Sequence, residues 1–185
     1  MVFQETDLGL ILEAVQFAAV KHQHQRRKDV KETPYINHPI AVATTLWQVG
    51  EVRESAVLIA ALLHDTIEDT ETTREEIRAR FGEEVLTLVL EVTDDKTLDK
   101  AVRKQLQIEH AAEKSPRAKL IKLADKTNNI YDISHSPPSD WTSERCVEYL
   151  DWTEKVVAGL RGTNAALEAR YDKTLSEARR LLERR

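Results

Sequence analysis

The amino-acid sequence predicts an all-α protein, a compact bundle of roughly eight to ten helices. Its 185 residues include only five glycines and five prolines, and the chain is rich in Ala, Leu, Glu, Lys and Arg, which favour helices. No run alternates apolar and polar residues for long enough to predict a sheet. With 41% hydrophobic residues the chain can bury a substantial core, and its length suits one domain better than two. We therefore expect a single domain over residues 1–185.

The charge and the cysteine content argue against several classes of protein. A net charge of −5 and a pI near 5.7 disfavour a general binder of nucleic acid or of anionic membranes, although they permit a local basic pocket. Cys146 is the single cysteine, and residues 1–7 lack the basic and apolar regions of a secretory signal. No apolar stretch approaches the roughly 20 residues that span a bilayer. We expect a cytoplasmic protein without nucleic-acid or membrane partners, and the sequence leaves its oligomeric state open.

The first predicted helix covers residues 8–23, where apolar residues recur at steps of three and four. A basic loop at residues 25–34 follows it. Arg27 and Lys28 in this loop suit phosphate binding or stacking on a base, because a guanidinium presents a planar fork of donors and an ammonium a compact charge. A solvated charge run without any function explains the same residues.

The next helix is expected to begin near Asn37, whose side chain can cap it, with Pro39 in the first turn. His38 then lies at the start of this helix. A lone histidine at such a position is usually structural, so His38 gains meaning only if other metal-ligand types lie near it in the fold.

The most informative stretch is a buried helix that ends in charged groups. Residues 57–63 are apolar on nearly every helical face, which predicts a helix surrounded by other helices. If the helix continues, His64 lies above Glu68 and Asp65 above Asp69. Carboxylates beside an imidazole at the edge of a core are costly unless a charge compensates them, and a divalent cation can do so. Alternatively, the His-Asp pair only caps the helix and the two later carboxylates begin a solvated loop.

Two sequence signals mark the ends of the following helix. Thr72 or Thr73, with Glu75 or Glu76 three residues later, predicts a capping box at its start, and residues 81–82, Phe-Gly, are expected to close it. Core-facing apolar residues resume at residues 85–92, before a polar loop at residues 93–97. Lys96 and Lys100 nearby are candidate anion-binding residues, although most such lysines are only solvated.

The C-terminal part of the chain contains three further predicted helices. Ser115-Pro116 combines a capping hydroxyl with a proline at the first helical position, and the helix that it starts carries Asp125 on an apolar background. The segment 134–140 reads as a loop, and residues 141–160 resume a helix. An amphipathic helix at residues 167–182 is expected to pack on the body of the protein. Together, the predicted helices supply four candidate metal ligands: His38, His64, Asp65 and Asp125.

These residues resemble the HD superfamily of metal-dependent phosphohydrolases, whose pattern is a His, a His-Asp pair and a later Asp. The longer motifs are similar to the hydrolase domain of RelA/SpoT-type alarmone enzymes. Residues 91–98 and 159–167 extend the resemblance to the stand-alone small alarmone hydrolases, animal and bacterial, over nearly the full length. The motifs that carry it are Arg27-Lys28 before Pro34-Tyr35-Ile36-Asn37-His38-Pro39, the string Ala61 to Asp69, and Leu123-Ala124-Asp125-Lys126.

The resemblance implies a compact HD-domain bundle that hydrolyses the 3′-pyrophosphate of guanosine tetra- or pentaphosphate to GDP or GTP plus pyrophosphate, usually with Mn²⁺. Imidazole and carboxylate ligands without thiolates suit such an ion better than a closed structural zinc site, while iron, cobalt and zinc stay open. In this interpretation the ion polarises a phosphate oxygen and lowers the pKa of a water molecule. Glu68 and Asp69 then orient or deprotonate the attacking water.

The resemblance also implies substrate contacts. Arg27 and Lys28 are expected to border the guanine and ribose-phosphate pocket, and Asn129 to read the base or pack against it. The chain departs from the family pattern at residues 127–128, where Thr-Asn replaces a more common apolar or aromatic pair, so the choice of base is less well defined than the phosphohydrolysis. Three more residues are expected to contact phosphate or ribose: Lys100, Arg145 and Tyr149.

Two other functions fit the same residues. The protein could be a broader phosphatase that removes a 2′- or 3′-phosphate from another purine nucleotide or dinucleotide, because the metal ligands do not identify the leaving group. It could instead be a catalytically silent alarmone-binding sensor. Glu68 and Asp69 argue against a sensor, since a binder needs no carboxylates to activate water. A purely structural helical protein would leave the polar cluster at the core edge unexplained.

Overall fold

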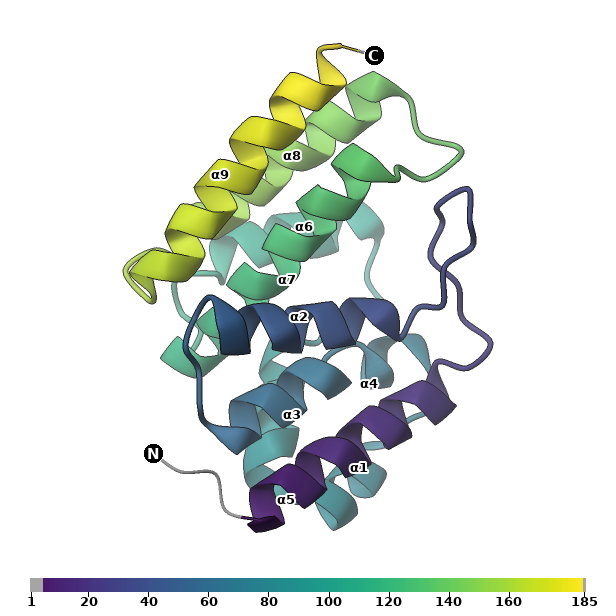
Figure 1. Cartoon of the computed structure of the whole chain (residues 1–185), viewed down its shortest axis with the longest axis vertical. Coiled ribbons are helices and arrows are strands. Elements are labelled where there is room, and N and C mark those ends of the chain that lie inside the picture. Colours follow the sequence, from purple (N-terminus) through teal and green to yellow (C-terminus); the bar gives the residue numbers. More distant parts are fainter. Residues whose placement is uncertain (1–4, 185) are drawn as a thin grey trace.

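The computed structural model describes residues 5–184, in which the regular structure is helical. Only two isolated β-bridges accompany the helices in this part of the chain, Arg26–Pro34 and Asp29–Pro138. The predicted all-α class is confirmed. The helices, labelled in Figure 1, are α1 (Glu5–Lys21), α2 (Asn37–Gln48), α3 (Ser55–Leu63), α4 (Thr66–Asp69), α5 (Arg74–Val92), α6 (Lys100–Glu109), α7 (Pro116–His135), α8 (Ser143–Ala158) and α9 (Ala165–Leu182).

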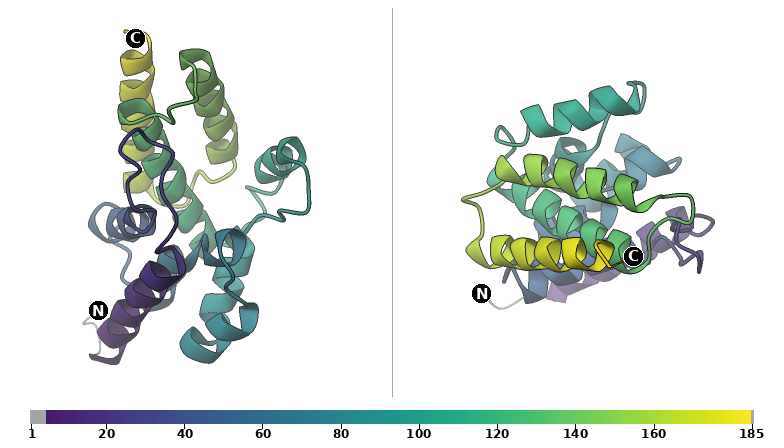
Figure 2. Two further views of the ribbon diagram at one scale, coloured as in Figure 1. Left: turned by 90° about the vertical axis from the view of Figure 1, so that its right-hand side faces the viewer. Right: turned by 90° about the horizontal axis from the view of Figure 1, so that it is seen from above.

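The helices form two groups joined by α7. Helices α1 to α5 lie together at one end of the molecule, and α7, α8 and α9 run side by side at the other (Figure 1). The first turns of α7 reach down to α2, α3 and α5, so this helix contributes to both groups. Helix α6 contacts α8 and stands away from the rest of the bundle (Figure 2, left). No helix in residues 5–184 is long and apolar enough to cross a membrane.

Helix α3 is the centre of the first group. It packs against α1, α2, α5 and α7, and every residue from Val57 to Leu63 is buried. Burying apolar side chains on all faces stabilises the fold by roughly 1.5–3 kcal/mol for each Leu, Ile or Val. The predicted buried helix is therefore confirmed, and it holds its C-terminal end in a fixed place within the bundle.

The polar end of α3 differs from the expected continuous helix. The helix ends at Leu63, and Asp65, with φ −101° and ψ −3°, interrupts the helical backbone before the single turn of α4. The expectation that His64 lies one turn above Glu68 on one unbroken helix is therefore wrong. Asp69 N–H still donates to the Asp65 carbonyl at 2.8 Å, which keeps the later carboxylates close to the His-Asp pair.

Helix α5 starts where expected and is interrupted where its end was expected. Thr73 accepts from the backbone N–H of Glu76, whose carboxylate accepts from the N–H of Thr73 in return, so the capping box is formed. Gly82 interrupts the helix with φ +85°, a value that glycine adopts at little cost. The predicted break at Phe81-Gly82 is confirmed, although helical residues continue on both sides of it.

Other boundaries shift by a few residues. Asn37 is the first residue of α2, and Ile36 stands at the cap position without a side-chain hydrogen bond, so the expected asparagine cap is wrong. Ser115 caps α7 through the N–H of Ala118 as predicted, but α7 continues through His135, into the expected loop. Helix α9 packs along α7 and α8, which confirms the expectation that it belongs to the body.

Candidate active site

Three helices bring the predicted metal ligands together. His38 lies in the first turn of α2, the pair His64 and Asp65 follows α3, and Asp125 lies in the middle of α7. These helices contact one another in all three combinations, α2 with α3, α2 with α7 and α3 with α7. All three helices contribute buried apolar residues to the core, and their polar side chains lie where the helices converge.

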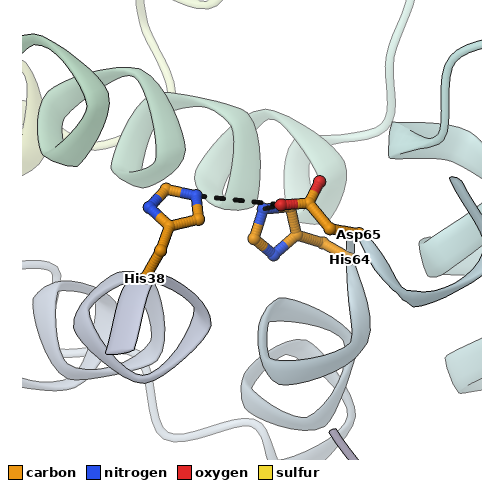
Figure 3. Close-up of side chains that lie close together, drawn as sticks. All are labelled: His38, His64 and Asp65. Atoms are coloured by element: carbon orange, nitrogen blue, oxygen red, sulfur yellow. Dashed lines mark ion pairs between the residues drawn. The ribbon is translucent and has the colours of Figure 1, made fainter. Parts of the chain in front are cut away.

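The ligand atoms lie within a few ångströms of one another. One atom from each of His38, His64 and Asp65 falls within a group spanning 4.8 Å (Figure 3). His64 Nε2 lies 3.0 Å and His38 Nε2 3.9 Å from Asp65 Oδ2. Asp125 Oδ1 lies 3.1 Å from His38 Nε2 and 3.8 Å from His64 Nε2. The four side chains therefore face one small volume.

The orientation of His64 leaves one nitrogen available to a metal ion. Its Nδ1 donates a hydrogen bond of 2.7 Å to the Ala61 carbonyl, and a carbonyl can only accept, so Nδ1 carries a proton. Nε2 is buried and faces Asp65 Oδ2 at 3.0 Å without a hydrogen bond of good geometry, and in the neutral ring its lone pair is free to bind a cation. A metal-binding histidine typically has this arrangement, in which a backbone carbonyl fixes the tautomer. The residues present thus fit a divalent cation.

The electrostatics of the cluster also favour a positive charge. Burial alone lowers the pKa of His64, but the carboxylates of Asp65 and Asp125 raise it to about 9. Burial acts in the opposite direction on Asp65, and the two nearby imidazoles hold the pKa of its carboxyl well below the usual range. Carboxylates that stay ionised in a buried site need cations beside them, and a protonated imidazole and a metal ion both meet that need.

Asp125 is held in place by two neighbours on its own helix. Lys126 Nζ donates to Asp125 Oδ2 at 3.1 Å, and Asn129 Nδ2 donates to Oδ1 at 2.6 Å. Asn129 Oδ1 in turn accepts from Arg27 at 3.3 Å. Asn129, predicted to contact the base, therefore lies between a predicted ligand and a predicted substrate-binding arginine.

Tyr35 is a site residue that the sequence interpretation did not single out. Its hydroxyl donates a hydrogen bond of 2.6 Å to Asp65 Oδ2, the oxygen nearest the two histidines. Burial and the Asp65 carboxylate raise the pKa of Tyr35 well above its ordinary value, so the hydroxyl keeps its proton and remains a donor. The tyrosine lies within the motif quoted from residues 34–39, but its partner is 30 residues away, and the spacing does not indicate it.

Glu68 and Asp69 lie beside the cluster in α4, mostly buried. Glu68 Oε2 accepts from the backbone N–H of Asp94 at 3.1 Å, and its Oε1 lies 3.8 Å from both Lys96 Nζ and an Arg103 nitrogen. Asp69 accepts from Gln25 at 3.2 Å and contacts Lys96. Burial raises the pKa of Glu68 above its ordinary value, which suits a group that exchanges protons closer to neutral pH.

The larger of two cavities near the cluster has a volume of about 690 Å³, within the range of small-molecule sites, and it reaches the cluster at His38 and Asp69. Arg27 and Lys28 from the basic loop line it together with His38 and Asn129. Arg27 donates to Asp132 at 2.6 Å and lies over the Tyr35 ring at 5.6 Å. The structure therefore brings both predicted basic residues to the same cavity as the His-Asp cluster.

A second cavity, of about 350 Å³, meets the first at Trp141 and Tyr149, which line both. Lys100 and Arg145, two predicted phosphate contacts, lie in this second cavity rather than beside the metal cluster. Two cations that the sequence interpretation did not single out, Arg103 and Lys104, line it as well. Their position depends on how α6 packs against α8, a long-range contact that no local spacing reveals.

Comparisons with known proteins agree with this geometry. An HD domain family model matches residues 14–149. The guanosine-3′,5′-bis(diphosphate) 3′-pyrophosphohydrolase MESH1 of Xenopus tropicalis is 56% identical over 90% of this chain and 93% of its own. The human protein of that name is 54% identical over 88% and 91%. A solved structure of a metazoan orthologue of SpoT, described as hydrolysing ppGpp and acting in starvation responses, matches with a TM-score of 0.90 and 48% identity over 96% of this chain and 98% of that one.

Proposed function

The chain belongs to the HD domain family, and we propose that it hydrolyses the 3′-pyrophosphate of guanosine tetra- and pentaphosphate. The products are GDP or GTP and pyrophosphate. One observation carries the proposal: His38 of the His-Asp cluster lines a cavity of about 690 Å³ that Arg27 and Lys28 also line. The relatives that share most of the chain's length carry this activity in their names. In this proposal residues 1–185 form a single, cytoplasmic HD hydrolase domain.

The proposed metal ligands are His38, His64, Asp65 and Asp125. Their support is the convergence of the ligand atoms and the buried Nε2 of His64, which faces the Asp65 carboxylate at 3.0 Å. A bound divalent ion, which we propose to be Mn²⁺, would polarise the phosphate and acidify water. The mixed imidazole and carboxylate donors suit this hard or borderline ion.

The proposed water-activating groups are Glu68 and Asp69. Glu68 is anchored at one oxygen by the Asp94 N–H, and its raised pKa makes the carboxylate a better proton acceptor than an exposed glutamate. In the reaction a water oxygen bonds to phosphorus while the bond from phosphorus to the ribose 3′ oxygen breaks. One proton of the water goes to the carboxylate, and the 3′ oxygen leaves as a hydroxyl after it gains a proton.

The remaining predicted residues are proposed to hold the nucleotide. Arg27 and Lys28 would bind the guanosine end in the larger cavity, with Asn129 close to Arg27. Lys100, Arg145 and Tyr149 would bind the 5′-phosphates in the second cavity. The shared wall at Trp141 and Tyr149 supports this division, because one ligand can then extend from the first cavity into the second.

The proposal is tested by product analysis. Metal-stripped protein is incubated with guanosine tetraphosphate, with and without Mn²⁺, and the products are separated by ion-exchange chromatography, with His64→Ala protein as the control. The expected result is GDP and pyrophosphate only when Mn²⁺ and His64 are both present.

Absence of turnover by protein that demonstrably binds Mn²⁺ would overturn the assignment. A panel of nucleotides with 2′- or 3′-phosphates then decides between the remaining activities, since release of orthophosphate from one of them would identify a broader nucleotide phosphatase. Tight binding of guanosine tetraphosphate without any phosphate release would identify a sensor.

A further inference from the structure

His22 is a buried histidine that the proposed reaction does not use. It follows the last residue of α1, its backbone N–H donates to the Ala18 carbonyl at 2.9 Å, and only 1% of its surface is exposed. It is not among the proposed metal ligands, yet its side chain contacts two residues that each hold a carboxylate of the active site. These two contacts define two separate connections from His22 to the site.

The first connection runs through Gln25 to Asp69. Gln25 Nε2 donates to Asp69 Oδ2 at 3.2 Å, which leaves the amide oxygen of Gln25 facing His22. His22 Nδ1 lies 2.6 Å from this oxygen, and an amide oxygen only accepts, so Nδ1 must donate. The amide of Gln25 is therefore held at both ends, with its NH₂ group toward Asp69 and its oxygen toward His22.

The second connection runs through Tyr35 to Asp65. The rings of His22 and Tyr35 pack with centroids 4.9 Å apart and an interplanar angle of 36°. The Tyr35 hydroxyl donates to Asp65 Oδ2 at 2.6 Å. Because the tyrosine ring is pressed between His22 on one side and His38 at 5.9 Å on another, its hydroxyl has little room to leave the carboxylate.

We propose that His22 is a positioning residue that orients Asp69 through Gln25 and Asp65 through Tyr35. This inference rests on the proposed hydrolysis, in which Asp69 helps to activate water and Asp65 binds the metal. Outer-shell groups that orient ligands and bases typically change metal affinity or activity by about 10–100-fold when they are removed. His22 does not itself line the substrate cavity, but Gln25 and Tyr35 both do, so its effect on the site is transmitted through these two neighbours.

The protonation of the ring is consistent with this role. Burial lowers the pKa of His22, so the ring is neutral near neutral pH and carries a single proton. That proton is needed on Nδ1 for the Gln25 contact, while Nε2 is buried without a partner. Long-range ¹H–¹⁵N spectra of the metal-free protein are expected to show His22 protonated at Nδ1 and unprotonated at Nε2, and the reverse tautomer would overturn the inference.

Substitutions test the Gln25 connection. His22→Phe keeps a ring against Tyr35 but removes the donor, and Gln25→Leu removes the amide. Each is expected to lower kcat by about 10–100-fold, and His22→Phe, at a residue that does not line the cavity, should leave KM nearly unchanged. The double variant should be no worse than the more impaired single variant, because both changes break the same connection. The matched control is His24→Phe, the same substitution at an exposed histidine two residues away.

A second pair of variants tests the Tyr35 connection without any catalysis. Mn²⁺ affinity is measured by titration for His22→Phe and His22→Ala. The phenylalanine variant should bind nearly as the original protein does, whereas the alanine variant, which leaves Tyr35 unsupported, should bind about tenfold more weakly. Equal affinities would overturn this connection.

The outcomes separate this inference from the proposed function. An original protein that fails to hydrolyse guanosine tetraphosphate contradicts the proposed function, while the tautomer and the Mn²⁺ affinities still decide the role of His22. An active original protein whose His22→Phe variant keeps kcat within about threefold, or whose double variant shows additive losses, contradicts the role of His22 alone. Thermal unfolding checks each variant, and if His22→Phe fails to fold, Gln25→Leu in the half-buried loop carries the kinetic test.

Discussion

Helices α3 and α6 both position side chains of the proposed site, but the bundle holds the two helices in opposite ways. In α3 all residues from Val57 to Leu63 are buried, and the His-Asp pair follows directly. In α6 none of the residues from Lys100 to Glu109 is buried, and its cations line the second cavity. Metal ligands must be fixed within a few tenths of an ångström, whereas cations can attract phosphate from flexible side chains. In the proposed site, packing around α3 fixes the metal ligands in position, whereas the charges of α6 attract the phosphates.

The histidines that follow these two helices give the largest expected contrast. His64 stands after the last residue of α3 and His110 after the last residue of α6, where it is exposed. His64→Ala should weaken Mn²⁺ binding by more than about 100-fold and lower turnover by about 10⁴-fold or more. His110→Ala should change neither. Mn²⁺ titration and steady-state kinetics measure both, and comparable losses in the two variants would contradict the contrast.

Glu68→Gln is expected to have the next largest effect. It removes the proposed proton acceptor while keeping the shape of the side chain, so kcat should fall by about 10²–10⁴-fold and Mn²⁺ binding should persist. Glu71→Gln, at an exposed glutamate three residues later, is the matched control and should behave as the original protein. Full activity of the Glu68→Gln protein would remove this residue from the mechanism.

A substitution in α3 should destabilise the protein more than one in α6. Ile59→Ala in α3, at a side chain 2% exposed, should lower the free energy of unfolding by about 2–5 kcal/mol. Val102→Ala in α6, at a side chain 45% exposed, should change it by less than about 0.5 kcal/mol. Urea denaturation of the metal-free proteins measures both values. A large loss at Val102 would show that α6 is a structural element rather than an exposed support for cations.

A cation in the second cavity should affect binding more than chemistry. Arg145→Gln should raise KM for guanosine tetraphosphate by about tenfold, with a smaller change in kcat and a weaker dependence of KM on salt. Lys173→Gln makes the same change of charge at an exposed position of α9 outside both cavities. If the two variants had equal KM values, Arg145 would not contribute to substrate binding.

The smallest expected effect is a difference between two carboxyl groups. In metal-free protein Glu68 should titrate above its ordinary value because burial raises its pKa, while Asp95, whose carboxylate accepts from Thr97, should titrate below its own. Because its pKa is higher in the folded state than in the unfolded state, Glu68 stabilises the fold at pH values below its unfolded-state pKa. This stabilisation is lost as the pH rises through the folded-state pKa. Carbon-detected NMR of the carboxyl groups checks both directions. Titration of Glu68 at or below its ordinary pKa would show that burial does not raise the pKa of this carboxyl.

The fold and the ligand types were predictable where the signal is local. Continuous apolar residues predict the buried helix, Thr73 and Ser115 supply capping signals, and Gly82 marks a break. The interruption at Asp65 was not predictable, because the dihedral angles there depend on which groups the side chains of the turn meet in the folded protein. Local patterns support the continuous helix that the structure does not contain.

Residues that act through distant partners were also missed. Tyr35 reaches Asp65 across 30 residues, and Arg103 approaches Glu68 only because the loop before α6 returns to α4. Residue type and spacing carry no information about such contacts. The family resemblance supplied several predicted substrate residues, but it did not predict that Lys100 and Arg145 lie in a separate cavity from Arg27 and Lys28.

The shared wall of the two cavities has a consequence for the design of inhibitors. A polyanionic compound held by the cations of α6 and α8 and resting on Trp141 and Tyr149 would occupy part of the proposed nucleotide path without chelating any metal. If such a fragment were linked to a second one that binds the neighbouring cavity, the second fragment would bind at a high effective concentration. Selective blockers of this protein could therefore avoid metal-binding groups, which act on many unrelated enzymes.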